Sequence, residues 1–514
     1  MARRVQPIST YLGAAAAALL VLLTLGTLGA VAWRAEGLSG LRATDWLAVR
    51  FTVLQAFLSA LISVILAVPV ARALARRQFR GRGVLITLLG APFILPVIVA
   101  VLGLLAVFGR NGLVNSALVW GGLEPVSIFG LQGVLLAHVF FNLPLATRLL
   151  LQGWLAIPGE RFRLAASLGF SDRDVFRHLE LPLLKAVLPG AFMVIFLICT
   201  TSFAVALALG GGPRATTIEL AIYQAFRFDF DLSKAALLAL VQFGLCALAA
   251  TLSLWISVPM GQGTGLGRVV PRNGGSLWLD AGVLALASAF LLVPLAMIIG
   301  KGAGTVFTLP DSTWGAAWRS VWVAVASALT TLALALPLAL AALNLRARVV
   351  EGIGYLSIAA SPLVIGTGLF IMVYRWADPV ALALPILILV NAAMSLPFAL
   401  RAISPALAEI EADYGELADS LDLSGWSRMR VLILPRLRRP MGFGAGLAAA
   451  LSMGDLGVIA LFADPENQTL PLALYQLMNA YRLDDAFGAA LLLLTLSLTL
   501  FWLFDRGGRA DVDA

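Results

Sequence analysis

Residues 153–186 read GWLAIPGERFRLAASLGFSDRDVFRHLELPLLKA, and residues 402–439 read AISPALAEIEADYGELADSLDLSGWSRMRVLILPRLRR. The first stretch carries 9 charged side chains in 34 residues and the second carries 11 in 38, which is the charge density of a soluble surface. The rest of the 514-residue chain is apolar: 60% of all residues are hydrophobic and only 12% are charged, against about 25% in soluble domains. The two stretches are therefore loops in water that connect segments lying in lipid.

The apolar residues extend over the whole chain and predict an all-α polytopic membrane protein. A hydrocarbon core about 30 Å thick takes about 20 helical residues, and this window divides the chain into about 12 transmembrane helices. The expected spans are residues 11–33, 50–74, 84–109, 131–152, 187–209, 233–257, 277–300, 319–345, 352–374, 380–401, 440–462 and 485–504. A cleavable signal peptide is the alternative for the first span, because Arg3 and Arg4 precede it. We favour an uncleaved span, because the apolar run is longer than a typical signal-peptide core.

The basic residues are distributed unequally between the two sides of the membrane. With the N-terminus placed in the cytoplasm, 25 of the 36 Lys and Arg residues fall in cytoplasmic loops or termini. Cytoplasmic loops retain Lys and Arg, so both termini are predicted to be cytoplasmic. The net charge of +8 follows from this bias, and no nucleic-acid partner is expected.

The two charged loops belong to an internal repeat. An offset of 253 residues aligns Leu143-Pro144 with Leu396-Pro397, Ser167-Leu168 with Ser420-Leu421, and Leu181-Pro182 with Leu434-Pro435. The sequence thus predicts two tandem six-span repeats, residues 1–258 and 277–514, joined by a cytoplasmic Gly-rich linker at 259–276. Because each repeat has an even number of spans, both enter the membrane the same way up, and a transport path is expected between them.

The first charged loop is predicted to form two short helices. The first helix extends from Glu160 to Leu168 and ends at Gly169, where a helix commonly reverses into the left-handed conformation. Ser171 and Asp174 have the spacing of a capping box for the second helix, and Pro182 is expected to end that helix. The small side chains of the first helix suit docking in a groove of a partner protein, and packing on the membrane face of the bundle is the alternative.

The pattern in both loops resembles the cytoplasmic signature of permease subunits of bacterial ATP-binding-cassette importers: Glu-Ala-Ala, three residues, Gly, and Leu-Pro thirteen residues further. Arg163 stands in place of the first Glu in one half, and Asp422 stands in place of the Gly in the other. The resemblance implies the type I importer permease fold, with each loop a coupling helix in a cleft of an ATPase subunit and hence two ATPase copies. The coupling residues it implies are Arg163, Leu164, Ala165, Ala166, Gly169, Glu416, Leu417, Ala418, Ser420 and Asp422.

Three longer strings are similar to permeases of thiamine and thiamine-diphosphate importers. They are His138-Val139-Phe140-Phe141-Asn142-Leu143-Pro144, Leu209 to Pro213 followed by Ala215 to Glu219, and Gly454 to Val458 with Thr469-Leu470-Pro471. Fused ferric-iron permeases share the duplicated architecture and are the alternative within this class. The resemblance implies a multi-pass protein of the bacterial inner membrane, in contact with membrane lipid, that receives its substrate from a periplasmic binding protein.

Absent motifs narrow the function further. No Gly-x-x-x-x-Gly-Lys-Ser/Thr occurs, so ATP is expected on a separate ATPase subunit and this chain is expected to bind no cofactor. No metal site is expected, since Cys199 and Cys246 lie in apolar stretches and only two histidines occur. We predict a transport subunit and no enzyme. A 12-span proton-coupled secondary transporter is the alternative of another class, but residues 76–83 lack the acidic residue which that class carries between spans 2 and 3.

Four polar residues within or beside the spans are candidates for the translocation path or its gate. A carboxylate in a membrane costs about 2.5 to 3.5 kcal/mol, so Asp455 and Glu219 are expected to face the bundle interior or water. Asp455 either contacts the substrate or bonds a neighbouring helix, and both interpretations stay open; Glu219 is expected to be a gate or a binding-protein contact. For His138 and Asn142, hydrogen bonds between helices are expected more than ligand contacts.

Overall fold

The computed structural model describes residues 7–35, 41–90, 94–212, 215–256, 276–344, 352, 357, 360–462 and 464–509. Every regular element in these ranges is a helix, and ten helices are long and apolar enough to cross a membrane. The predicted all-α polytopic architecture is therefore confirmed. The expected linker, residues 259–276, lies outside the described residues except for Ser276, as do Arg3 and Arg4.

The helices occur in the same order in the two halves. The first half contains α1 (Pro7–Val21), η1 (Leu22–Gly26), α2 (Thr27–Arg34), α3 (Ala43–Arg76), α4 (Arg82–Leu88), α5 (Val97–Phe108), α6 (Leu113–Trp120), α7 (Leu131–Ala156), α8 (Gly159–Ser167), α9 (Asp172–Val175), η4 (Phe176–Glu180), α10 (Leu181–Thr200), α11 (Ala204–Leu209), α12 (Ile218–Arg227) and α13 (Leu232–Ile256). The second half contains α14 (Leu277–Gly302), η6 (Val306–Thr308), α15 (Asp311–Asn344), α17 (Pro362–Val373), α18 (Ala383–Ser420), α19 (Gly425–Arg428), η7 (Met429–Ile433), α20 (Leu434–Met453), α21 (Gly457–Phe462), η8 (Pro465–Asn467), α22 (Leu470–Asn479) and α23 (Leu483–Arg509). The helices α9, η4, α10 and α11 each begin 253 residues before α19, η7, α20 and α21, so the offset seen in the sequence is also the offset of the structure.

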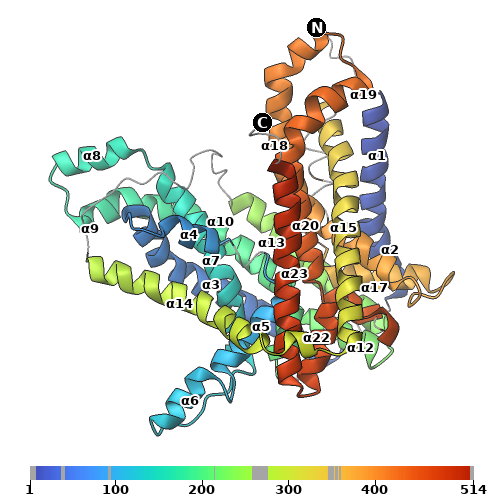
Figure 1. Cartoon of the computed structure of the whole chain (residues 1–514), viewed down its shortest axis with the longest axis horizontal. Coiled ribbons are helices and arrows are strands. Elements are labelled where there is room, and N and C mark those ends of the chain that lie inside the picture. Colours follow the sequence, from blue (N-terminus) through green and yellow to red (C-terminus); the bar gives the residue numbers. More distant parts are fainter. Residues whose placement is uncertain are drawn as a thin grey trace.

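The two halves form two bundles that meet at one end (Figure 1). Helices α3, α7, α10 and α14 form one bundle, and α15, α18, α20 and α23 form the other. Helices α5, α12 and α22 lie where the bundles meet, whereas α8 and α9 stand far from α19 at the opposite ends. The bundles therefore diverge toward the two charged loops.

The first helices of the two halves are exchanged between the bundles. Helix α1 packs on α15 and α2 packs on α17, both in the second half, while α14 packs on α3 and α5 of the first half as well as on α23 of its own half. The N-terminus of α14 is also held by charge, because Asp280 accepts hydrogen bonds from Nε of Arg76 (2.8 Å) and Nε of Arg77 (2.7 Å). Each bundle is thus completed by a helix from the other half of the sequence.

Two equivalent glycines allow these exchanged helices to approach closely. A Cβ at Gly103 of α5 would lie 2.8 Å from the carbonyl oxygen of Pro294 in α14. A Cβ at Gly368 of α17 would lie 2.6 Å from the carbonyl oxygen of Thr27 in α2. Small residues at helix contacts drive membrane packing, because the backbones can then approach within van der Waals distance. A close backbone contact at a glycine therefore holds each of the two exchanged helices.

Two of the expected spans are helices divided at matching places, and a third, residues 84–109, is divided between α4 and α5. Residues 187–209 contain the end of α10 and then α11, with a break at 201–203, and residues 440–462 contain α20 and α21 with a break at 454–456. The breaks occupy equivalent positions of the repeat. The prediction that Pro182 ends a helix is wrong, because Pro182 is the second residue of α10 and follows the π-helical segment η4 directly. The helical path is continuous from Asp172 to Thr200, and the π-helical turn of η4 precedes the proline.

Three non-glycine residues among the described ranges have positive φ angles. They are Phe230 (φ 53°), Asp422 (φ 50°) and Tyr481 (φ 57°), and each such residue costs about 1 to 2 kcal/mol because its Cβ crowds the carbonyl oxygen. Phe230 and Tyr481 each stand two residues before the start of α13 and α23. They occupy the same position before the following helix in each half, although the turn of the first half is one residue longer.

The glycine contacts generate the first prediction. Gly103→Ala and Gly368→Ala should each lower the free energy of unfolding by about 1 to 3 kcal/mol, because the added methyl group overlaps a backbone carbonyl of the exchanged helix. Thermal unfolding of the purified protein in detergent measures the change. Gly244→Ala in α13 is the matched control, since a Cβ there meets nothing within 4 Å. Unchanged unfolding of both contact variants would show that close backbone packing does not hold the exchange.

Candidate functional site

The two helix breaks lie together at the junction of the halves. A Cβ at Gly457, the first residue of α21, would lie 2.8 Å from Cδ1 of Leu363 and 3.6 Å from Cδ1 of Phe203. Phe203 belongs to the break between α10 and α11 of the first half. The same Cβ would lie 3.9 Å from Oδ1 of Asp455. An aromatic ring from one half and a carboxylate from the other therefore share one small space.

Asp455 precedes α21 and faces the N-terminus of that helix. The backbone N–H groups of Gly457, Val458 and Ile459 lie beside its carboxylate, and its Oδ2 atom is buried with no partner among the described residues. The positive end of the helix stabilises a negative charge at this place. The carboxylate thus lies at the N-terminus of α21 with its Oδ2 atom available to a partner.

At the offset of 253, the residue of the first half that corresponds to Asp455 is Ser202, and His138 hydrogen-bonds Ser202. Nε2 of His138 lies 2.8 Å from Oγ of Ser202, and Nδ1 lies 3.0 Å from Oγ of Ser59 in α3. Asn142 donates to the carbonyl oxygen of His138 (2.9 Å) and to Sγ of Cys199 (3.3 Å). His138 and Asn142 therefore tie α3 and α7 to the break after α10, as hydrogen-bond partners between helices.

The second half contains a corresponding tie with different residues. Asn391 donates to Oγ of Ser452 (2.9 Å), and Ser452 donates to Oγ of Ser327 (3.1 Å). At the repeat offsets, Asn391 corresponds to His138 and Ser327 corresponds to Ser59. Both helix breaks are therefore positioned by buried polar side chains from the two neighbouring helices.

Glu219 lies in the first turn of α12, and its side chain is fully buried. Neither carboxylate oxygen has a hydrogen-bond partner among the described residues, although the side chains of Gln242 and Ser361 lie beside it. Ser361 belongs to the second half, where its hydroxyl caps α17 by accepting from the N–H of Val364 (3.1 Å). Glu219 is therefore a carboxylate of the first half that faces the second.

The first charged loop contains the first of its two predicted short helices, α8, and the helical segments of both loops end in the same turn. In the first, α8 is followed by Gly169 (φ 70°), and the Ser171–Asp174 capping box is present. In the second, the corresponding residues form the last turns of α18, and Asp422 adopts the left-handed conformation that Gly169 has in the first loop. The replacement of Gly by Asp therefore preserves the backbone path.

The leucines and alanines of these loops point in opposite directions. Ala165 and Ala418 are only 4% and 2% exposed, so they pack within the chain. Leu164 and Leu417, their neighbours, are 60% and 56% exposed. One turn further on, Leu168 and Leu421 are also exposed. The surface offered outward is therefore a matched pair of leucines in each loop.

The remaining coupling residues also lie on the loop surfaces. Arg163 forms an exposed ion pair with Glu160 (2.9 Å), and Ser420 donates to the carbonyl oxygen of Leu417 (2.7 Å). Ala166 and Glu416 are exposed.

An arginine braces the second loop and has no counterpart in the first. Arg428 of α19 forms ion pairs with Glu411 (2.6 Å) and Asp419 (2.7 Å), both in α18. Burial lowers the pKa of the Arg428 guanidinium, but the hydrogen bonds to Asp419 and Glu411 outweigh burial and raise that pKa above its ordinary value. At the offset of 253 the first loop has Val175 in this place. The two loops share a backbone path and differ in how it is held.

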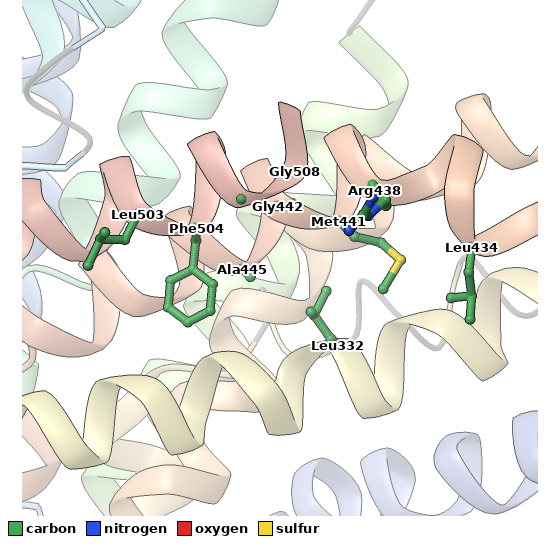
Figure 2. Close-up of a pocket in the computed structure, with 10 residues that line it drawn as sticks. Leu332, Leu434, Arg438, Met441, Gly442, Ala445, Leu503, Phe504 and Gly508 are labelled. Carbon is green, nitrogen blue, oxygen red and sulfur yellow. The ribbon is translucent and has the colours of Figure 1, made fainter. Parts of the chain in front are cut away.

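A cavity of about 290 Å³ lies apart from the junction of the halves (Figure 2). It is a hollow lined by α15, α20 and α23, all of the second half, and its lining is apolar except for Arg438. The lining residues are Leu332, Leu434, Arg438, Met441, Gly442, Ala445, Leu503, Phe504, Gly507 and Gly508. Because all of them come from one bundle, this cavity is not the space between the halves. In the described part of the chain, no group of three His, Cys, Asp or Glu side chains could hold a metal ion.

The junction of the halves includes two residues that the sequence interpretation did not single out. Ser202 and Phe203 flank the junction in the first half, and the offset of 253 pairs Ser202 with Asp455. That pairing is the signal that could have identified Ser202. Phe203 carries no such signal, because its role follows from a contact with the other half.

Comparison with known proteins gives consistent results over nearly the whole chain. Residues 344–506 match the family of binding-protein-dependent transport system inner membrane components. The thiamine transport system permease protein of Escherichia coli K12 is 41% identical over 535 residues, covering 98% of each chain. Its counterpart in Salmonella typhimurium LT2 is also 41% identical, over 91% of this chain and 90% of that protein. The counterpart in Brucella abortus 2308 is 39% identical, over 98% of this chain and 96% of that protein.

The brace at Arg428 generates the second prediction. Arg428→Gln should speed amide hydrogen exchange in α19 about tenfold, because loss of a charged hydrogen bond of about 1.5 kcal/mol favours local opening. Exchange in α8 and α9 should stay unchanged. Arg173→Gln in the first loop is the control, since Arg173 is exposed. Equal exchange of α19 in the variant and the original protein would contradict the bracing role.

Proposed function

Because this chain belongs to the family of thiamine transport system permease proteins, we propose that it forms the membrane path of an ATP-driven importer of thiamine and thiamine phosphates. The observation that carries this function is the identity of about 40% that extends over both halves and both charged loops. The chain is a multi-pass permease of the inner membrane and no enzyme. A periplasmic binding protein delivers the substrate, and an ATPase on the cytoplasmic side supplies the energy.

Two ATPase copies fit the two charged loops. Each loop offers an exposed leucine pair on a helix that ends in a left-handed turn, and the two copies are related by the repeat. Exposed apolar side chains in a charged, water-facing loop indicate a protein partner. With these loops in the cytoplasm, both chain termini are cytoplasmic as well.

The mechanism is alternating access between the two bundles. The bundles meet at α5, α12 and α22 and diverge toward the charged loops (Figure 1), and we assign this arrangement to the state that faces the cytoplasm. ATP-driven closure of the ATPase pair brings the charged loops together and separates the halves at their outer end. Substrate then enters from the binding protein, and release of nucleotide products restores the first arrangement.

Asp455 and Phe203 are suited to a heteroaromatic cation such as thiamine. The unpartnered oxygen of Asp455 attracts positive charge, and the neighbouring ring of Phe203 offers a π face to a cation or to another ring. Desolvation strengthens both interactions, because the site lies away from bulk water. The break between α20 and α21 thus supplies a transient binding place along the path.

Glu219 acts as the outer gate in this mechanism. Its carboxyl group is buried against Ser361 of the opposite half, and none of the described residues forms an ion pair with it. Separation of the halves at this point exposes the carboxylate to water and to an incoming cation. Glu219 and Asp455, the two carboxylates assigned to the path, therefore come from different halves.

Uptake of thiamine by the reconstituted complex tests this function. Proteoliposomes that contain the chain, its ATPase and its binding protein should accumulate labelled thiamine with ATP inside the vesicles and lose this activity without ATP. Accumulation of ferric iron in place of thiamine would identify a ferric-iron permease. Accumulation that needs no ATP and collapses with a protonophore would identify a secondary transporter.

Asp455→Asn separates the charge of this residue from its capping role. Asparagine also caps helices, so the variant should keep its stability while thiamine uptake falls at least tenfold, because the cation loses its ionic partner. Asp455→Ala, which loses the cap as well, should lower the free energy of unfolding by about 1 kcal/mol. Initial uptake rates and thermal unfolding are measured side by side. Full uptake by Asp455→Asn would show that Asp455 acts only as a helix cap.

The exposed leucines are expected to carry the ATPase contact. Leu164→Arg and Leu417→Arg should each lower the amount of ATPase that co-purifies with the permease, and the double variant should abolish it, because a charge then replaces the apolar contact. Leu123→Arg, which changes an exposed leucine between α6 and α7, is the control and should retain assembly. Normal co-purification by the double variant would place the ATPase elsewhere.

A further inference from the structure

We propose that Phe230 and Tyr481 form a matched pair of aromatic anchors that dock the periplasmic binding protein on the outer end of the permease. This inference rests on the proposed function, because it names the surface that the binding protein contacts. The two residues occupy the turns after α12 and α22, at the same position before the following helix in each half, and both have left-handed backbone conformations.

Folding alone does not explain an aromatic residue at these two positions. Each turn is closed by backbone hydrogen bonds: the N–H of Asp231 donates to the carbonyl oxygen of Ala225 (2.9 Å), and the N–H of Arg482 donates to that of Leu477 (3.0 Å). Glycine adopts this left-handed conformation without strain and is the common residue in such turns. An aromatic residue here strains the backbone, and it does so in both halves.

The aromatic rings do not offset this strain through packing. Phe230 is 79% exposed and Tyr481 is 90% exposed, so neither ring contributes to a core of the chain. Residues held in strained backbone conformations cluster at functional sites. The strained backbone places each ring outside the fold, where the chain itself does not bury it.

The position of the turns identifies the partner. Helices α12 and α22 lie where the bundles meet, and the two charged loops, where we place the ATPases, lie at the opposite ends (Figure 1). Each of these helices also contacts the other half, α12 through α17 and α21, and α22 through α5. The rings are thus placed beside the outer opening of the path. A protein that delivers substrate there must contact both halves, and one ring from each half meets that requirement.

The surroundings of the rings favour a protein surface over lipid. Asp229, beside Phe230, has a side chain that is 57% exposed. Arg482, beside Tyr481, forms a partly exposed ion pair with Asp485 (2.6 Å). These charges keep both turns in water. Aromatic side chains among charged, hydrated neighbours match the composition of protein interfaces, in which aromatic anchors are surrounded by polar contacts.

The test compares docking with stability in Phe230→Asn and Tyr481→Asn, since asparagine tolerates the left-handed conformation. The purified complex of permease and ATPase in lipid nanodiscs is titrated with thiamine-loaded binding protein of the same transport system, and its affinity and its stimulation of ATP hydrolysis are measured. Each single variant should weaken binding about tenfold and the double variant further, while thermal stability stays equal or rises. Phe307→Asn changes an exposed aromatic residue in the turn between α14 and α15 and should bind normally.

Two results would overturn the inference. Affinity and stimulation within twofold of the original complex in the double variant would show that the rings do not dock the binding protein. A loss of stability or of membrane insertion, with affinity unchanged, would assign the rings to the lipid interface. If the loaded binding protein does not stimulate the original complex either, the proposed function itself fails, and this outcome is distinct from the other two.

Discussion

The close contact of exchanged helices at Gly103 and Gly368 is the constraint on which the rest of the structure depends. Inside a membrane, apolar helices gain little from leaving lipid, so backbone proximity and dispersion contacts must hold them together. At these two glycines a helix of one half lies against a backbone carbonyl of the other half. The halves are therefore interlocked near their meeting point and free to diverge at the opposite end, which is the geometry that alternating access requires.

The repeat gives both halves the same arrangement of helices, but single polar residues at matching positions differ between the halves. Asp455 has Ser202 as its counterpart, and Arg428 has Val175. Glu219 has no acidic counterpart either, because Pro471 stands in the matching position of α22. A buried carboxylate is costly, so a path that needs one negative charge at a given depth gains from placing it in one half only. The N-terminus of α21 offsets part of the cost for Asp455.

The sequence predicted the helical class, the repeat, the charged loops and the left-handed turn after α8, because each of these follows from local composition or from the offset between the halves. It did not predict that Ala165 and Ala418 pack inward while the neighbouring leucines face outward. Small side chains suit a groove in a partner and a tight contact within the chain equally well, so only the burial of each residue separates the two interpretations. Pro182 was misjudged because a proline in the first turn of a helix is compatible with a helix that continues from a π-helical segment.

By itself, the sequence determined that the protein lies in a membrane, that it consists of two similar halves, and that two loops of soluble composition face one side. These properties depend on the length of the apolar segments, on the distribution of basic residues and on the similarity between the two halves. All three can be read along the chain. Only the tertiary structure decided that the first helices are exchanged, that Phe203 meets the space beside Asp455, and that Glu219 is buried against Ser361. Such contacts join residues far apart in sequence, and they depend on backbone approach and side-chain direction, which no local pattern of residues encodes.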